Sequence, residues 1–100
     1  MPIRIDPQNN ESQALFNLVD FKGQSVLEIG CGDGRLTWLY AGKAAHVVAI
    51  DPFEEGITQA KKNTPPELQN RVEFQRSAFM DFAATNRPST FDIAILSWSL

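Results

Sequence analysis

Five residues between positions 28 and 51 combine the chemistry of a small-ligand site. Glu28 and Asp51 stand in or just after apolar runs, and Gly30, Gly32 and Gly34 occupy alternate positions between them. Glycine lacks Cβ and takes positive φ easily, so a ligand can approach its main chain closely. The N–H groups of such a loop attract polar or anionic groups, and carboxylates accept hydrogen bonds from hydroxyls. The spacing indicates a cradle for a small polar ligand.

Two common glycine loops do not fit this spacing. A phosphate-binding P-loop has the pattern G-x-x-x-x-G-K-[ST], but Arg35 stands where the second glycine belongs, and no Lys follows it. A dinucleotide loop has the pattern G-x-G-x-x-G, and Arg35 replaces its third glycine. The pattern E-x-G-x-G-x-G remains, from Glu28 to Gly34. A plain turn is the structural alternative.

Strands and helices must alternate to hold these residues at one edge of a sheet. Apolar or alternating runs predict strands at residues 25–29, 47–50, 71–75 and 91–96. Helical spacing predicts helices between residues 9 and 23, at 36–42, at 52–64 and at 79–84. This alternation favours parallel strands with right-handed crossovers. We therefore predict an α/β fold, a Rossmann-like doubly wound parallel sheet with strand order 3-2-1-4.

The two outer strands of this sheet differ in character. Residues 71–75 alternate between apolar and polar side chains, which is typical of a half-exposed edge strand. Residues 91–96 are apolar and would form a bare edge. We therefore expect the chain to be a fragment, truncated after the fourth strand, and expect partner pairing through the fourth-strand edge.

Composition narrows the class of protein. One hundred residues make about one domain. The net charge is −3 and the longest basic run is Lys61-Lys62, so no nucleic-acid partner is expected. A single cysteine, Cys31, fits a reducing compartment. No apolar run approaches the roughly 20 residues of a membrane span. We expect a soluble cytoplasmic protein without a metal site.

Three segments resemble the class I S-adenosylmethionine-dependent methyltransferases. Residues 27–34, Leu-Glu-Ile-Gly-Cys-Gly-Asp-Gly, are similar to the first motif of that family. Asp51 follows Gly32 by roughly 20 residues, as expected for an acid that binds a ribose. Residues 91–100 are similar to the family's fourth strand, and their Ser-Trp-Ser-Leu ending resembles the branch that methylates small molecules.

The resemblance implies an S-adenosylmethionine cofactor and methyl transfer to a small-molecule acceptor. Residues 1–100 would form the cofactor-binding part of the methyltransferase domain, and we expect this part to be weakly active or inactive when isolated. Two other classes stay open. One is a non-catalytic cofactor-binding or partner module of the same fold. The other is a nicotinamide-dependent oxidoreductase, against which Arg35 counts.

The resemblance also implies roles for the residues of the first motif. Glu28 would contact the charged methionine end of the cofactor, directly or through water; the alternative is a structural partner, either a helix N-terminus or a structural water. A buried carboxylate needs a partner in either case. Gly30, Cys31 and Gly32 would pass under the methionine part.

The later strand ends would hold the adenosine. Asp51 would accept both ribose hydroxyls, or cap the next helix through a D-x-x-E capping box. Pro52 would start that helix, and Phe53 would either cover the adenine or join the core.

The turn after the third strand would meet the adenine edge. It consists of Ser77, Ala78 and Phe79. Many relatives carry an acid in this turn, whereas here the first acid is Asp81. Ser97 and Trp98 end the fourth strand. Ser97 would contact the cofactor there, and Trp98 would either wall the methyl-transfer site or pack in the core. No residue is assigned as a general base.

Overall fold

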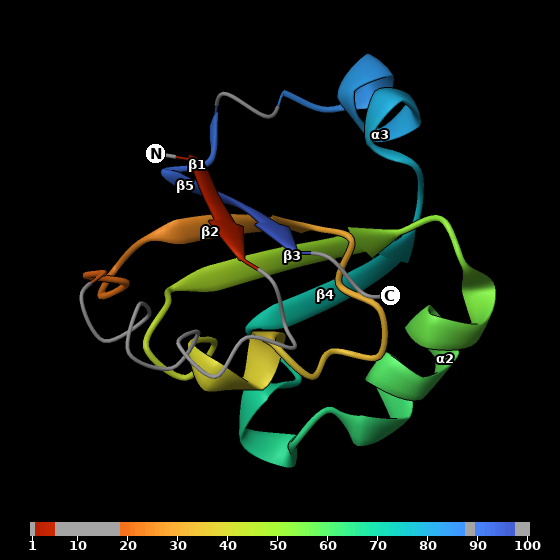
Figure 1. The fold of residues 1–100 in the computed structure, drawn as a ribbon. Helices are drawn as coiled ribbons and strands as arrows, with labels where there is room; N and C mark the ends of the chain where they lie inside the picture. Colours follow the sequence, from red (N-terminus) through yellow and green to blue (C-terminus); the bar gives the residue numbers. More distant parts are fainter. Residues whose placement is uncertain (1, 6–18, 88–89, 98–100) are drawn as a thin grey trace.

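A single parallel sheet forms the centre of the molecule (Figure 1). The computed structural model describes residues 2–5, 19–87 and 90–97. Its strands are β1 (Pro2–Ile5), β2 (Ser25–Ile29), β3 (His46–Asp51), β4 (Val72–Arg76) and β5 (Ile93–Ser97). They lie in the order β1-β5-β2-β3-β4, and every neighbouring pair is parallel. The predicted order 3-2-1-4 corresponds to β4-β3-β2-β5 and is confirmed.

Strand β1 lies on the edge that was expected to be bare. It pairs with β5 in parallel, with Pro2 opposite Ala94 and Ile5 opposite Ser97. Four residues that include a proline make a weak strand pattern, although proline is tolerated at the first position of an edge strand. The expectation of a bare fourth-strand edge is therefore wrong. A partner strand could pair there only by displacing β1. Strand β4 forms the opposite edge, as its alternating pattern predicted.

Two predicted helices are present and one is not. The structure contains α2 (Glu54–Asn63), α3 (Phe79–Thr85) and the short 3-10 helices η1 (Thr37–Leu39) and η2 (Pro66–Leu68). The helix predicted at residues 36–42 is wrong, because only η1 forms there. The chain turns at Gly34, where φ is +87°, and then directs two hydroxyl side chains into the core. The helix predicted between residues 9 and 23 lies mostly outside the described residues.

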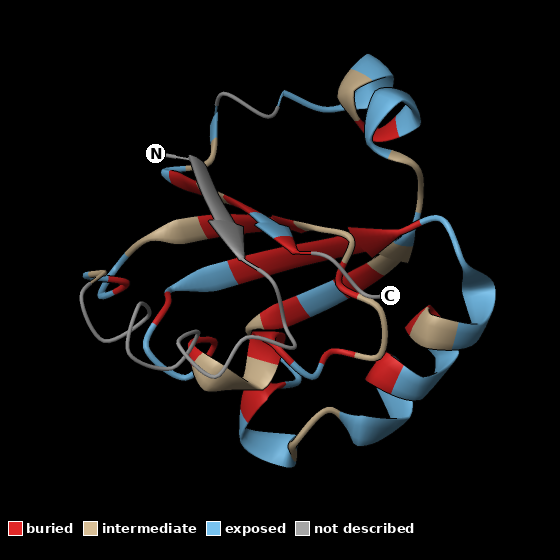
Figure 2. Ribbon diagram, in the orientation of Figure 1, coloured by how far each residue is buried: buried red, intermediate tan, exposed pale blue. Residues whose placement is uncertain are grey.

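The sheet is covered on both faces, as a doubly wound fold requires. One face packs under α2 and η1, and its core includes Val47, Phe74, Ile95 and the α2 residues Ile57 and Ala60. The other face packs under α3 through Leu27, Val48, Ile50 and Phe82. Figure 2 shows buried residues following the central strands and exposed residues following the outer sides of α2 and α3. Alternate residues of β2 and β3 thus pack into the cores on opposite faces of the sheet.

The loop after β2 is held between β5 and α2. Gly30 has φ of +83°, and a Cβ there would lie 2.5 Å from the main-chain oxygen of Ser97. Gly56, in the first turns of α2, would place a Cβ 3.0 Å from the main-chain carbonyl carbon of Gly32. Close approach of main chain to main chain therefore requires glycine at position 30, and it leaves unusually little room for a side chain at position 56. The position of this loop depends on the end of β5 and the start of α2.

Replacing Gly30 by alanine tests this close contact, with Gly23→Ala as the matched control. Gly23 also has positive φ, +72°, but among the described residues a Cβ there meets nothing within 4 Å. Gly23→Ala should lower the free energy of unfolding by about 1–2 kcal/mol, the cost of the left-handed conformation alone. Gly30→Ala should lose about 1–3 kcal/mol more, because the main chain of β5 must shift.

Urea unfolding of the two variants measures the difference. Equal losses of unfolding free energy in the two variants would mean that the contact between Gly30 and Ser97 relaxes freely. That result would contradict the conclusion that β5 holds the loop in place.

Candidate functional site

The predicted site residues gather at the carboxyl edge of the sheet. The chain leaves β2 toward β3 on one side, while β5 lies on the other side of β2, so the strand order reverses between β2 and β5. Ligands of open α/β sheets bind at such switch points. The residues at this edge are Glu28, Gly30, Cys31, Gly32, Asp51, Pro52, Phe53, Ser77, Ala78, Phe79 and Ser97. The predicted Trp98 lies outside the described residues.

Asp51 ties three main-chain segments together at this edge. Its Oδ2 accepts the Gly32 N–H at 3.0 Å and its Oδ1 accepts the Phe53 N–H at 2.9 Å. Its main-chain oxygen accepts the Ser77 N–H at 2.9 Å. The side chain is 4% exposed, and each carboxylate oxygen keeps capacity for one further hydrogen bond.

The capping-box interpretation of Asp51 is wrong. Helix α2 begins at Glu54, its N-cap residue is Phe53, and this cap makes no side-chain hydrogen bond. Asp51 instead bonds the N–H two residues ahead, which shapes the turn between β3 and α2. Its second oxygen holds the glycine loop.

Five main-chain N–H groups of the glycine loop already have hydrogen-bond partners in the protein. The donors are Gly30, Cys31, Gly32, Gly34 and Arg35. Their acceptors are the main-chain oxygens of Ile50 and Cys31 and the carboxylates of Asp51 and Asp33. These five N–H groups are therefore not free donors for a ligand in this structure, and attraction of polar or anionic ligand groups by the loop stays a prediction. The Asp51 carboxylate beside the loop can attract a cation.

Glu28 lies inside the protein and is satisfied by hydroxyl groups. Its carboxyl is 0% exposed. Oε1 accepts the hydroxyls of Thr37 at 2.8 Å and Tyr40 at 2.6 Å, and Oε2 lies 3.1 Å from Ser97 Oγ. Burial raises the pKa of Glu28, and the three hydroxyl contacts oppose that rise. Burial also raises the pKa of the Tyr40 phenol, so this hydroxyl stays protonated.

The predicted need for a partner at Glu28 is confirmed, but its chemistry was missed. The partners are side-chain hydroxyls from η1, the following turn and β5. Thr37 and Tyr40 lie three residues apart in a segment expected to cover the sheet. This spacing places both side chains on one face of the segment, and it is the sequence signal that could have identified them as partners of Glu28.

Cys31 packs as an apolar residue. Its side chain is 5% exposed and belongs to the core beneath α2 and η1. Burial raises the pKa of its thiol, so the nucleophilic thiolate is not formed near neutral pH.

An open depression of about 330 Å³ lies between the loops after β3 and β4. It is lined by Pro52, Arg76, Ser77, Ala78 and Asp81. Asp81, a position beyond the predicted site, thus reaches the same depression as the Ser77-Ala78 turn. Sequence reasoning also passed over Arg76, whose Nε donates to the Pro52 carbonyl oxygen at 3.4 Å.

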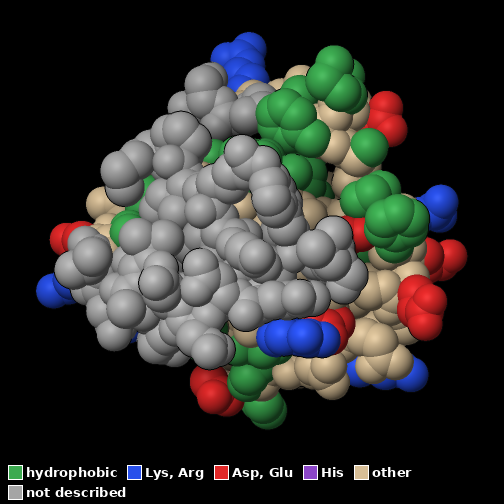
Figure 3. Space-filling model, in the orientation of Figure 1, with side chains coloured by type: hydrophobic (Ala, Val, Ile, Leu, Met, Phe, Trp, Pro, Cys, Tyr) green, Lys and Arg blue, Asp and Glu red, His purple; other side chains and the backbone are tan. Residues whose placement is uncertain are grey.

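Exposed hydrophobic side chains lie next in sequence to residues that line this depression. Phe53 is 73% exposed, Met80 77% and Phe79 39%. Figure 3 shows hydrophobic side chains gathered over α3 and over the loop that follows β3. The core alternative for Phe53 is therefore wrong, and its ring is available to a ligand.

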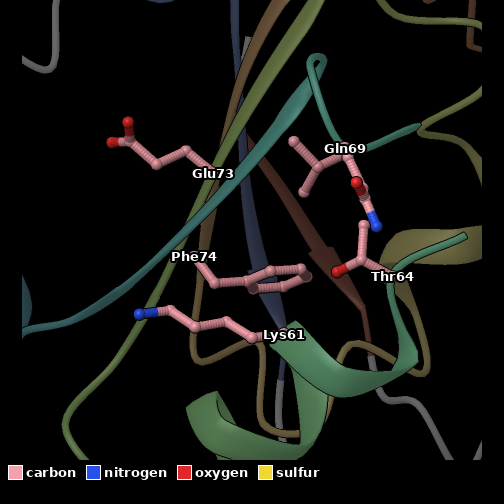
Figure 4. Close-up of a pocket in the computed structure, with 6 residues that line it drawn as sticks. Lys61, Thr64, Gln69, Glu73 and Phe74 are labelled. Atoms are coloured by element: carbon pink, nitrogen blue, oxygen red, sulfur yellow. The ribbon is translucent and has the colours of Figure 1, made fainter. Parts of the chain in front are cut away.

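A second depression, of about 340 Å³, lies between α2 and β4. Figure 4 shows the Phe74 ring directed toward α2, with Lys61 and Thr64 beside it and Glu73 on the other side of the strand. None of the predicted site residues lines it. Among the described residues there is no cluster of three or more possible metal ligands, and no helix long and apolar enough to span a membrane.

Comparisons with known proteins agree with this geometry. Residues 26–100 match the methyltransferase-domain family. The mitochondrial ubiquinone biosynthesis O-methyltransferase of Bos taurus is 34% identical over 77 residues, which are 75% of this chain and 20% of that protein. The magnesium-protoporphyrin O-methyltransferase of Rhodobacter capsulatus is 42% identical over 55 residues, 55% of this chain and 25% of that protein. The chain thus spans a fifth to a quarter of these relatives.

Structural similarity extends the comparison to the fold. Phosphoethanolamine N-methyltransferase 1 of Haemonchus contortus, solved with phosphoethanolamine and S-adenosylhomocysteine, superposes with a TM-score of 0.71 at 20% identity. The match covers 93% of this chain and 19% of that one, and it concerns the fold alone. Together with the family match over residues 26–100, the motif of β2, the acid of β3 and the parallel sheet show that this chain belongs to the class I S-adenosylmethionine-dependent methyltransferases.

Proposed function

We propose that the protein transfers a methyl group from S-adenosylmethionine to a small-molecule acceptor, and that these residues form its cofactor-binding part. The observation that carries this proposal is the Asp51 carboxylate, held at the end of β3 by the glycine loop and by the following turn. An acid fixed in this way beside a switch point suits a ribose diol.

The charge of the glycine loop supports a cationic ligand. S-adenosylmethionine carries a sulfonium and an ammonium, which the Asp51 carboxylate at this edge attracts. A dinucleotide would instead bring a pyrophosphate to amide groups that are already bonded within the protein. This difference argues against the nicotinamide-dependent alternative.

The depression between the loops after β3 and β4 supports a place for adenine. In this proposal Pro52 and the exposed Phe53 cover one face of the base. Ser77, Ala78 and Phe79 meet its edge. Aromatic faces stack favourably on flat rings.

The loop after β2 would hold the methionine part of the cofactor. Gly30, Cys31 and Gly32 pass beneath it in this proposal. Direct or water-mediated contact of Glu28 or Ser97 with the cofactor stays a prediction. In the structure, hydroxyls or main-chain oxygens surround both side chains.

The bound cofactor supplies a sulfonium methyl group that is already activated. The protein's task is therefore to hold the acceptor in line with the methyl–sulfur bond and to exclude misaligned encounters. Two relatives are named O-methyltransferases, which favours an oxygen as the attacked atom. We propose that residues outside this chain complete the acceptor site, so the isolated chain is inactive. A cytoplasmic location stays a prediction.

Calorimetry with S-adenosylhomocysteine tests the role of Asp51. Asp51→Ala should weaken binding at least tenfold, because two charge-assisted hydrogen bonds to ribose contribute about 1.5–3 kcal/mol each. Native protein should bind S-adenosylhomocysteine and show no comparable heat with NAD.

Asp33→Asn is the control, since Asp33 is a loop acid paired with Arg35 rather than placed at the end of β3. Circular dichroism must show that both variants are folded. A folded Asp51→Ala protein with native affinity would mean that Asp51 only shapes the loops.

Phe53→Ala tests the proposed adenine contact. Because Phe53 is 73% exposed, its loss should leave the free energy of unfolding nearly unchanged. S-adenosylhomocysteine binding should weaken roughly two- to tenfold, which corresponds to about 0.5–1.5 kcal/mol of aromatic stacking.

Met80→Ala, which removes a side chain that is 77% exposed on α3, is the matched control and should bind normally. Equal affinities for native and Phe53→Ala protein would remove Phe53 from the site.

A further inference from the structure

The hydroxyl of Ser97 stands among three oxygen atoms and carries one hydrogen. Its Oγ lies 2.8 Å from the carbonyl oxygen of Gly30, 3.1 Å from Oε2 of Glu28 and 3.3 Å from the carbonyl oxygen of Ile29. Carbonyl oxygens and ionised carboxylates only accept hydrogen bonds. An ionised Glu28 would therefore leave one hydrogen for three acceptors.

The other hydroxyls that contact Glu28 do not supply the missing hydrogen. The hydroxyls of Thr37 and Tyr40 both donate to the other carboxyl oxygen, Oε1. In the part of the chain that the structure describes, Ser97 is the hydrogen-bond partner of Oε2. If Ser97 donated to Gly30, an ionised Oε2 would be a buried anionic oxygen without a donor, which is strongly unfavourable. If Ser97 donated to Oε2, the short contact with Gly30 would lack a hydrogen.

We propose that Glu28 is a neutral carboxylic acid in the folded protein, with Oε2–H donating to Ser97 Oγ and Ser97 donating its own hydrogen to the Gly30 carbonyl oxygen. Both close contacts then contain a hydrogen, and Oε1 keeps its two donors. The chain of bonds joins β2, β5 and the first residue of the glycine loop. Glu28 and Ser97 are positioning residues for the Gly30 carbonyl.

The surroundings of Glu28 favour its neutral form. Its cross-strand neighbours are Ala49 on β3 and Ile95 on β5, both apolar. Asp51 on β3 is the charged group that acts on it, and its negative charge opposes ionisation. The ion pair that the described residues contain, Asp33 with Arg35, does not include Glu28. Burial also raises the pKa of Glu28 and so favours the neutral form as well.

Glu28→Gln distinguishes the two protonation states, because glutamine reproduces the neutral acid. Its amide oxygen accepts from Thr37 and Tyr40, and its NH₂ donates to Ser97. The native protein retains the Glu28 proton on folding, while the unfolded chain releases it above the ordinary pKa of 4.5. The native stability from this group is present below that pH and is lost as pH rises toward the folded pKa. The folding equilibrium constant should fall by up to about tenfold per pH unit.

Urea unfolding of the cofactor-free protein from pH 4 upward measures this dependence. Glu28→Gln should match native stability at the acid end, exceed it increasingly at higher pH, and lack this pH dependence. Glu67→Gln, which changes an exposed glutamate, should keep the native profile. A Glu28→Gln protein that is unfolded, or at least tenfold less stable at every pH, would overturn the proposal.

Infrared spectroscopy gives an independent measurement on the native side chain. At neutral pH the protein should show the C=O stretch of a protonated carboxyl, absent from Glu28→Gln and present in Glu67→Gln. Absence of this band in native protein would show an ionised Glu28. The positioning of Gly30 for a cofactor rests on the proposed function, whereas the proton does not. Failure of S-adenosylhomocysteine binding would therefore leave this result unaffected.

Discussion

A carboxyl group enclosed within the central sheet organises the segment that follows β2. Glu28 has no access to solvent, so the protein must supply every hydrogen-bond partner that water would have offered. Thr37 and Tyr40 reach it only if the chain turns back over the sheet, and Ser97 reaches it from β5.

The two acids of the site differ in what surrounds them. Glu28 is enclosed by hydroxyl groups, which can donate or accept. Asp51 is held by main-chain N–H groups, which can only donate and so match an ionised carboxylate. One acid thus belongs to the internal architecture, while the other keeps hydrogen-bonding capacity at the edge where ligands bind. Their separate environments come from neighbouring strands of one sheet.

Strand order and most elements could be predicted because they depend on short-range patterns. Residues 25–29, 71–75 and 52–64 showed apolar, alternating and helical spacing that the fold largely retained. The Pro2–Ile5 strand could not be predicted, since four residues carry little pattern and their partner lies at the far end of the chain. The role of Asp51 in holding Gly32 could not be predicted, because it depends on the close approach of two loops. The hydroxyl partners of Glu28 could not be predicted either, because they depend on how the chain turns where the helix predicted at residues 36–42 does not form.

The position of β1 has a consequence for how the sheet forms. Its register places Pro2 beside Ala94, so the two strands that meet at this edge come from opposite ends of the chain. Pairs with such wide sequence separation close slowly, because the intervening chain must first lose its conformational freedom. During synthesis β1 emerges before β5, so β1 has no neighbouring strand in this sheet until β5 is available. Of the five described strands, β1 is thus made before the other four but cannot pair until the last of them has been made.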